Sequence, residues 1–208
     1  MKNLLIIDSA YTLKLIIDRK LNKFITSRDN NKYFHHVWTV HPVDNILDKG
    51  IEKNNFGKIS NYKINENHTF ICGQLGKYYF LRNFKILNFF ISKFFLIKYL
   101  YKIIKLNNIH YIRSEDPLYN GLIAYFLSKI IYNKKLIICV FGNPDEIRKN
   151  NNKPLMPKLF KFIFLEKVIE KFVLRKADMI IVQNHDNKNF VKSKKISDDK
   201  IKIFKIGR

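Results

Sequence analysis

Polar residues that can bind the hydroxyl groups of a ligand follow several short apolar runs of this sequence. The candidates for a binding site are Asp8, Ser9, Glu115, Asp116, Phe141, Gly142, Asn143 and Asn184. Carboxylate, hydroxyl and amide groups form hydrogen bonds with ligand hydroxyls, and a glycine lets a ligand approach the backbone. The alternative is that Asp8, Asp116 and Asn143 cap helices and form turns. As a set, these residues favour a binding site, and we assign no catalytic residue among them.

Other patterns of chemically competent residues are incomplete. The segment Gly73-Gln74-Leu75-Gly76-Lys77 has the residue types of a phosphate-binding loop but not its spacing. His35 and His36 would point to opposite faces of a strand, so they cannot share one metal ion. The sequence has no Asp-x-Asp pair that could anchor a metal-bridged nucleotide. We therefore expect no metal site.

Short runs rich in Ile and Val alternate along the chain with longer segments of helical period. This alternation is typical of a parallel sheet with crossover helices. Most of the runs are continuously apolar, as in strands that helices cover on both faces. The predicted strands are residues 4–7, 34–40, 68–72, 109–113, 136–140, 179–182 and 201–204. The predicted fold class is α/β, a doubly wound, Rossmann-like parallel sheet of about six or seven strands.

Helices are predicted in the segments between the strands. Residues 13–24, 118–131 and 158–176 have their apolar positions on one helical stripe. Residues 42–67 should form a loop with a poorly marked strand, and residues 150–153 a second loop. The carboxyl ends of parallel strands meet at one edge of a sheet, and ligands bind there. This arrangement would bring the eight candidate residues to the same edge.

The order of elements in the second half of the chain resembles a known family. One strand ends in Ser114-Glu115-Asp116, the next ends in Phe141-Gly142-Asn143-Pro144, and a helix closes on Arg175-Lys176-Ala177-Asp178 before another strand and Asn184. This series resembles the N-terminal, acceptor-side domain of retaining GT-B glycosyltransferases (family 4-like, group 1), which build bacterial glycolipids, capsules and surface polysaccharides. The resemblance covers residues 105–207 well and residues 1–100 by general plan.

The resemblance implies a two-domain enzyme of which this chain is one part. Residues 1–206 would form the Rossmann-like domain and residues 207–208 the start of an interdomain linker, with the C-terminal donor-binding domain absent. The whole enzyme would be a hexosyltransferase that moves a sugar from a nucleotide-sugar donor to a lipid-linked or saccharide acceptor. The nucleotide sugar would be a co-substrate held by the missing domain, with no cofactor. This chain alone would be incomplete and inactive.

Two positions depart from the pattern of the family. Many members have a glycine-rich loop after the first strand, where this chain has Asp8-Ser9-Ala10. Many also have a histidine at the position of Phe141. The departures leave two alternatives, a divergent acceptor pocket and an inactive member.

The 208 residues carry a formal net charge of +22. A strongly basic surface attracts anionic lipid head groups or phosphorylated ligands, although a general enrichment in Lys and Asn would also raise the charge. Residues 84–105 allow two interpretations: a crossover helix buried against the sheet, or a helix whose aromatic residues enter lipid while its lysines meet phosphates. The alternative function is therefore a basic membrane-surface or partner-binding module without its own catalysis.

The remaining composition bears on location and partners. No signal peptide is visible before Asp8, and five lysines make residues 84–105 a poor membrane span. The lysines are scattered and no nucleic-acid motif accompanies them, so we expect no nucleic-acid partner. Cys72 and Cys139 lie in apolar runs, which predicts buried, reduced thiols. We expect a cytoplasmic protein that is peripheral at the inner face of the plasma membrane.

Overall fold

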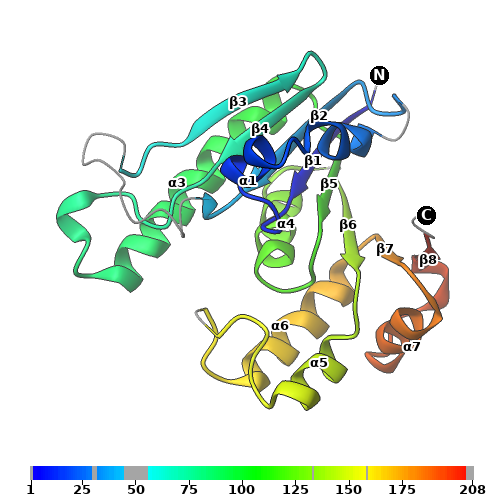
Figure 1. The fold of residues 1–208 in the computed structure, drawn as a ribbon. Coiled ribbons are helices and arrows are strands. Elements are labelled where there is room, and N and C mark those ends of the chain that lie inside the picture. Colours follow the sequence, from blue (N-terminus) through cyan, green and yellow to red (C-terminus); the bar gives the residue numbers. More distant parts are fainter. Residues whose placement is uncertain (1, 30–31, 45–55, 133, 158, 205–208) are drawn as a thin grey trace.

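A mixed sheet of eight strands has the order β3-β4-β2-β1-β5-β6-β7-β8 (Figure 1). The computed structural model describes residues 2–29, 32–44, 56–132, 134–157 and 159–204, so residues 207–208 of the expected linker lie outside it. The strands are β1 (Asn3–Ile7), β2 (His36–His41), β3 (Ser60–Asn65), β4 (His68–Cys72), β5 (Tyr111–Ser114), β6 (Lys135–Val140), β7 (Met179–Val182) and β8 (Ile201–Ile203). Seven strands are parallel, which confirms the predicted Rossmann-like α/β class.

β3 corrects the prediction of six or seven strands in a wholly parallel sheet. It pairs antiparallel with β4 and has no second neighbour, so it forms one edge of the sheet. All of its residues except Ile64 are exposed. Because an exposed edge strand has no buried face, it needs no apolar run, and the sequence marks it poorly.

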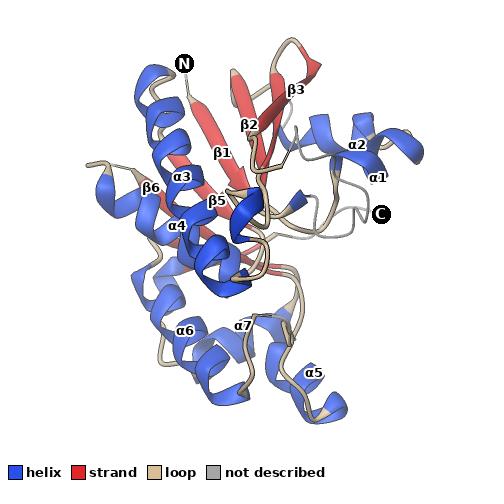
Figure 2. Cartoon of the chain, turned by 90° about the vertical axis from the view of Figure 1, so that its left-hand side faces the viewer, coloured by secondary structure: helices blue, strands red, loops and turns tan. Residues whose placement is uncertain are grey.

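Helices cover both faces of the sheet (Figure 2). The helices are α1 (Leu13–Asp18), α2 (Asn22–Thr26), α3 (Lys85–Leu106), α4 (Tyr119–Ile130), α5 (Pro144–Asn151), α6 (Ile163–Lys176) and α7 (His185–Ser193). Apolar residues of α3, α4, α6 and α7 share the main core with Ile71 of β4. The neighbours of that residue, Phe70 and Cys72, pack against α1 and α2 instead. Successive side chains of a strand point to opposite faces, so these are the two faces of one sheet.

Three helical segments differ from the predictions. The stripe at residues 13–24 is divided into α1 and α2, because Lys20 has a left-handed backbone conformation with φ 54°. The helix predicted for residues 158–176 begins only at Ile163. α5 occupies a segment that was predicted to be a turn and a loop. It begins at the cap Asn143 and is too polar to show an apolar stripe, so the helical period gave no signal.

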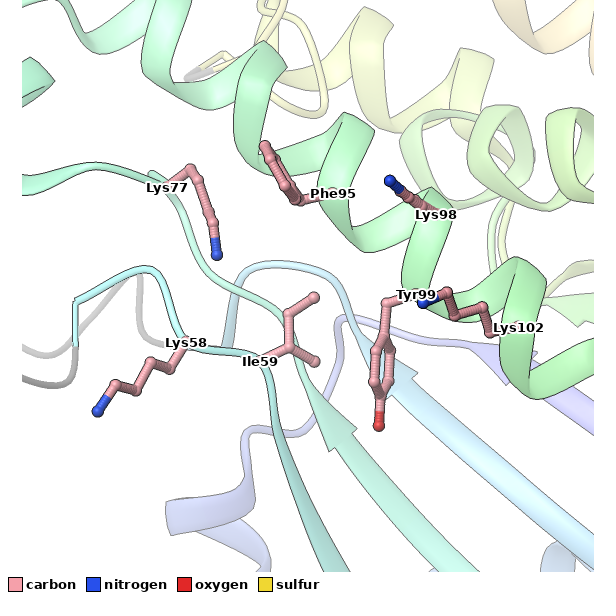
Figure 3. A pocket seen from close by; sticks show the side chains of 7 residues that line it. All are labelled: Lys58, Ile59, Lys77, Phe95, Lys98, Tyr99 and Lys102. Carbon is pink, nitrogen blue, oxygen red and sulfur yellow. The ribbon is translucent and has the colours of Figure 1, made fainter.

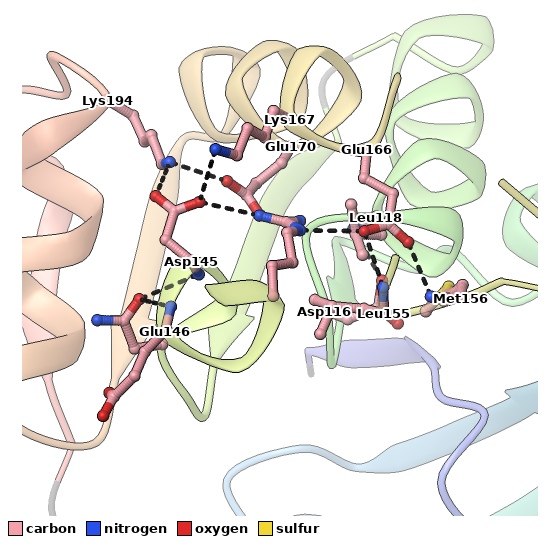
Figure 4. Close-up of polar contacts among 12 residues, drawn as sticks. Asp116, Leu118, Asp145, Glu146, Leu155, Met156, Glu166, Lys167, Glu170 and Lys194 are labelled. Atoms are coloured by element: carbon pink, nitrogen blue, oxygen red, sulfur yellow. Dashed lines mark hydrogen bonds and ion pairs between the residues drawn. The ribbon is translucent and has the colours of Figure 1, made fainter. Parts of the chain in front are cut away.

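A buried ion-pair network holds α5 against α6 (Figure 4). The guanidinium of Arg148 is 3.0 Å from Glu166 Oε2 and 2.7 Å from Glu170 Oε2, and both carboxylates are fully buried. Glu166 also accepts hydrogen bonds from the backbone N–H groups of Leu155 and Met156. The two glutamates of α6 therefore neutralise Arg148 inside the protein, and Glu170 also pairs with Lys194 at 3.2 Å.

The longest helix, α3, has one face buried against the sheet, as the first of the two interpretations of residues 84–105 predicts. Its buried residues are Asn88, Ser92, Lys93, Leu96, Leu100 and Ile104, which recur at intervals that define one helical face. This face packs on the sheet, so α3 is a crossover helix between β4 and β5. Cys72 and Cys139 are free and buried, as predicted.

Candidate functional site

The chain reverses the direction in which it builds the sheet between β1 and β5. From β1 it continues to β2 and β4 on one side, and α3 then returns it to β5, which pairs with the other side of β1. Loops leaving two such neighbouring strands diverge, and open α/β sheets bind ligands outside the carboxyl ends at this point. Asp8 and Ser9 follow β1, and Glu115 and Asp116 follow β5. Half of the predicted site residues therefore flank the topological switch point.

Asn120 of α4 links the two sides of this switch point. Its Nδ2 donates a hydrogen bond to Ser9 Oγ at 2.9 Å and another to the carboxylate of Asp116. Asp116 Oδ1 also accepts from the N–H of Leu118 at 2.8 Å. The structure thus brings Ser9 and Asp116 together, as the sequence predicted, through a residue that the sequence analysis missed.

Both carboxylate oxygens of Asp8 are occupied by hydrogen bonds within the protein. Asp8 is 2% exposed, and its two carboxylate oxygens accept from the N–H of Ala10 at 2.7 Å and from Arg28 Nη2 at 2.5 Å. Glu115 is less enclosed, and its carboxylate lies 2.6 Å from Arg113 Nη2. Of the two acidic residues, Glu115 can more readily release its ion pair with Arg113 and bind a ligand instead.

Burial changes the protonation of two groups near the switch point. Removal from water, assisted by the negative charge of Asp8, raises the pKa of Asp116 to about 6. His41, at the end of β2, contacts the carbonyl oxygen of Ser9 at 3.2 Å through Nε2. Burial lowers the pKa of His41, although Asp44 and Asp8 oppose the change. Asp116 can therefore act as a hydrogen-bond donor or acceptor near neutral pH.

Several buried polar atoms around the switch point lack a hydrogen-bond partner among the described residues. They are Arg28 Nη1, Tyr119 Oη and Asn120 Oδ1. Buried polar groups without partners are uncommon in folded proteins and need an explanation. These residues lie in or next to helices rather than at strand ends, so the search of strand ends did not find them.

The other predicted residues lie at the ends of β6 and β7 and serve as helix caps or turn residues. The side-chain oxygen of Asn143 accepts from the N–H groups of Asp145 and Glu146, and that of Asn184 accepts from Asn187. A side chain at Gly142 would meet only Ile147, at an ordinary 3.7 Å. Phe141 is 38% exposed at the same edge. Among the described residues, no hydrogen bond or ion pair joins these turns to the switch-point residues, and their role in binding stays a prediction.

The described residues contain no group of three or more His, Cys, Asp or Glu side chains that could hold a metal ion. No described helix is long and apolar enough to cross a membrane.

Comparison with known proteins identifies the fold. No protein-family model and no curated protein sequence matches the chain. Sucrose-phosphate synthase from Thermosynechococcus elongatus superposes on all of it, with a TM-score of 0.63 and 13% identity. Anabaena HepE in complex with UDP also superposes on all of it (TM-score 0.53, 10% identity), and UDP-GlcNAc 2-epimerase from Methanocaldococcus jannaschii on 98% (TM-score 0.52, 14% identity).

This chain has the Rossmann-like fold of GT-B glycosyltransferases. It spans 49% of the sucrose-phosphate synthase chain, 44% of HepE and 45% of the epimerase, so it matches about half of each. At these identities the likeness shows the fold alone. One of the three similar proteins is an epimerase, so the fold does not decide the reaction.

Proposed function

We propose that this chain is the N-terminal, acceptor-side domain of a retaining, family 4-like GT-B glycosyltransferase. The complete enzyme transfers a hexose from a nucleotide sugar to a lipid-linked or saccharide acceptor in bacterial glycolipid, capsule or surface polysaccharide synthesis. The donor is held by a C-terminal domain outside residues 1–206, and the reaction uses neither metal nor cofactor. The polar cluster at the switch point between β1 and β5 is the observation that carries this proposal.

The chemistry of this cluster suits an acceptor better than a nucleotide. It offers Ser9, Asp116 and Asn120 as groups that bind hydroxyls, whereas the nearby cations Arg28 and Arg113 are already paired with Asp8 and Glu115. In a transfer reaction, such groups orient the attacking hydroxyl, and orientation accounts for a large part of rate enhancement. Asp116, with a pKa of about 6, is the residue of this set best suited to exchange a proton with an acceptor hydroxyl.

A transfer assay separates the candidate reactions. The natural polypeptide that contains this sequence, with any donor-binding domain encoded alongside it, is incubated with UDP-glucose, UDP-GlcNAc or GDP-mannose and a bacterial lipid extract. We expect nucleotide release together with labelled sugar in the lipid or saccharide fraction. Residues 1–208 alone should release no nucleotide. Epimerised sugar nucleotide without transfer would show that the chain belongs to an epimerase instead.

A second candidate function, a module bound to the cytoplasmic face of an anionic membrane, is supported by the surface of α3, α4 and α6. This surface, which we call the helical face, lies in front of the sheet in Figure 2. Its exposed apolar residues include Ile86, Leu87, Phe90, Phe94, Phe126, Ile130, Phe164, Leu165 and Val168. Exposed apolar surface of this extent on a water-soluble fold marks an interaction site.

The charges on the helical face favour an anionic partner. α3 and α4 contain no acidic residue, and the glutamates of α6 are buried against Arg148. The exposed basic residues of these helices include Lys85, Lys98, Lys105, Lys129, Lys167 and Lys171. Aromatic side chains among lysines, without an exposed carboxylate, suit the boundary between lipid head groups and acyl chains. This function and sugar transfer to a lipid-linked acceptor are compatible.

A further inference from the structure

A basic pocket lies away from the switch point, between α3 and the segments that lead into β3 and away from β4 (Figure 3). Its volume is about 500 Å³. The residues that line it are Lys58, Ile59, Lys77, Phe95, Lys98, Tyr99 and Lys102. It is separated from β1 in the sheet by β4 and β2, so it is distinct from the candidate acceptor site.

Four of the seven lining residues are lysines and none is acidic. None of the four lysines forms an ion pair with any residue that the structure describes. Positive charges gathered around one pocket repel each other unless an anion lies between them. The unpaired lysines therefore favour a ligand with more than one negative charge.

The wall of the pocket that carries Lys77 is held in place by close backbone contacts. Gly57 has a left-handed conformation with φ +74°, and a Cβ atom there would lie 1.9 Å from the carbonyl oxygen of Lys77. Asn88 Oδ1 accepts from the N–H groups of Lys77 and Tyr78, at 2.7 and 2.9 Å. The ammonium of Lys77 donates to Gly57 O at 3.2 Å and retains further donors for a ligand. This lysine is therefore positioned before any ligand binds.

Aromatic side chains form the apolar part of the pocket. The ring of Phe95 lies 4.8 Å from the ammonium of Lys77, and Tyr99 Oη accepts a hydrogen bond from Asn61 Nδ2 of β3 at 2.5 Å. Figure 3 shows Phe95 and Tyr99 on the same helix as Lys98 and Lys102. A ligand that combines an anionic group with a less polar part would contact both kinds of surface.

We propose that this pocket binds a phosphate group attached to an organic molecule. A phosphate carries about 1.5 to 2 negative charges at pH 7 and three acceptor oxygens, and lysine binds it as a point charge. Two sources have this chemistry: a lipid whose head group is a phosphate monoester, as in phosphatidic acid, and a soluble phosphate monoester. The position of Lys98 one helical turn after the exposed Phe94 favours the lipid, because both follow one stripe of α3.

Calorimetric titration of the purified chain tests the proposal. The probes are inorganic pyrophosphate and dihexanoyl phosphatidic acid, at one fixed ionic strength because salt screens exposed charges. The pocket variant is Lys98→Gln with Lys102→Gln. The control variant is Lys14→Gln with Lys23→Gln, which loses the same charge from α1 and α2 on the opposite face of the sheet. All four lysines are exposed, so both variants should fold.

We expect saturable binding that the pocket variant weakens by about tenfold or more and the control leaves within about twofold, since hydrogen bonds to charged groups contribute at this level. Tighter binding of phosphatidic acid than of pyrophosphate would identify a lipid as the source, and equal binding a soluble phosphate. Equal weakening in both variants, or no saturable binding of either probe, would overturn the proposal. The titration needs no sugar transfer, so it can succeed or fail independently of the proposed enzyme.

Discussion

Asp116 accepts hydrogen bonds from Leu118 and Asn120, yet its carboxyl group is largely removed from water. Burial raises its pKa from 3.8 to about 6, so between these values the folded protein binds a proton that the unfolded chain does not. Lowering the pH from 6 to 4 should therefore stabilise the fold at this residue, by at most about 1.4 kcal/mol per pH unit.

The variant Asp116→Asn is neutral at every pH and should lack this dependence. Urea denaturation of the wild type and the variant at a series of pH values would measure how the difference between their free energies of unfolding changes with pH. The free energy of unfolding of the wild type, relative to the variant, should rise as the pH falls from about 6.5 to 4. A constant difference would mean that folding leaves the pKa of Asp116 near its unfolded value.

Asn143 shows how one residue type can fit a cap and a binding site equally well. Its side-chain oxygen accepts from Asp145 and Glu146 at the start of α5, so Asn143→Ala should cost about 1 kcal/mol of stability. Asn143→Asp keeps the accepting oxygen and should cost much less. Thermal melts of the two variants check this. If both leave stability unchanged but reduce sugar transfer by the complete enzyme, the amide binds ligand.

At the scale of the elements, the network around Arg148 decides how α5 and α6 stay together. Replacing Arg148 by Ala removes the cation shared by two fully buried carboxylates, although Glu166 keeps its backbone N–H donors and Glu170 keeps Lys194. Breaking a buried ion pair typically costs about 3–5 kcal/mol. The exposed Arg175 of α6 provides a control, because surface substitutions usually change stability by less than about 0.5 kcal/mol. Denaturation of Arg148→Ala and Arg175→Ala compares them directly.

We expect part of the stability lost in Arg148→Ala to return when Glu166 and Glu170 are made neutral as well. Glu166→Gln and Glu170→Gln, combined with Arg148→Met, remove the buried charges and retain most of the side-chain volume. If this triple variant is no more stable than Arg148→Ala, the loss comes from packing rather than from unpaired charge.

The sequence predicted the buried elements in detail, predicted β3 only as a poorly marked strand within residues 42–67, and missed α5. β1, β6 and β7 are buried along most of their length, so continuous apolar runs marked them. β3 and α5 have no comparable apolar signal: one is an exposed edge strand, and the other is held by a cap and by Arg148. Their stability depends on contacts with distant parts of the chain, which periodicity does not record.

The residues of the candidate site also divide into those that the sequence could predict and those that it could not. The residues after β1 and β5 were predictable, because parallel strands present their carboxyl ends at one edge. Arg28 and Asn120 were not, because their place depends on how α2 and α4 pack against the sheet. Asn120, 111 residues from Ser9 in the sequence, donates hydrogen bonds to both Ser9 and Asp116.

At the scale of the whole molecule, the two faces of the sheet differ in the surface that their helices offer. α3, α4 and α6 expose aromatic and basic residues and no carboxylate, whereas Asp18 and Asp29 are next to the short helices of the other face. An anionic membrane should therefore be approached by the helical face. The net charge of +22 strengthens this attraction at a distance.

Vesicle co-sedimentation tests this orientation with two phenylalanines of similar exposure. Phe94 on α3 is 65% exposed and Phe24 on α2 is 52% exposed. Phe94→Ser should weaken binding to vesicles of phosphatidylcholine and phosphatidylglycerol by about threefold to tenfold, because part of the 1.5–3 kcal/mol from burying a phenylalanine is lost. Phe24→Ser should leave binding unchanged, and salt should weaken it for every variant. Equal binding of the wild type to pure phosphatidylcholine would contradict the electrostatic part of the account, and equal effects of the two substitutions would contradict the orientation.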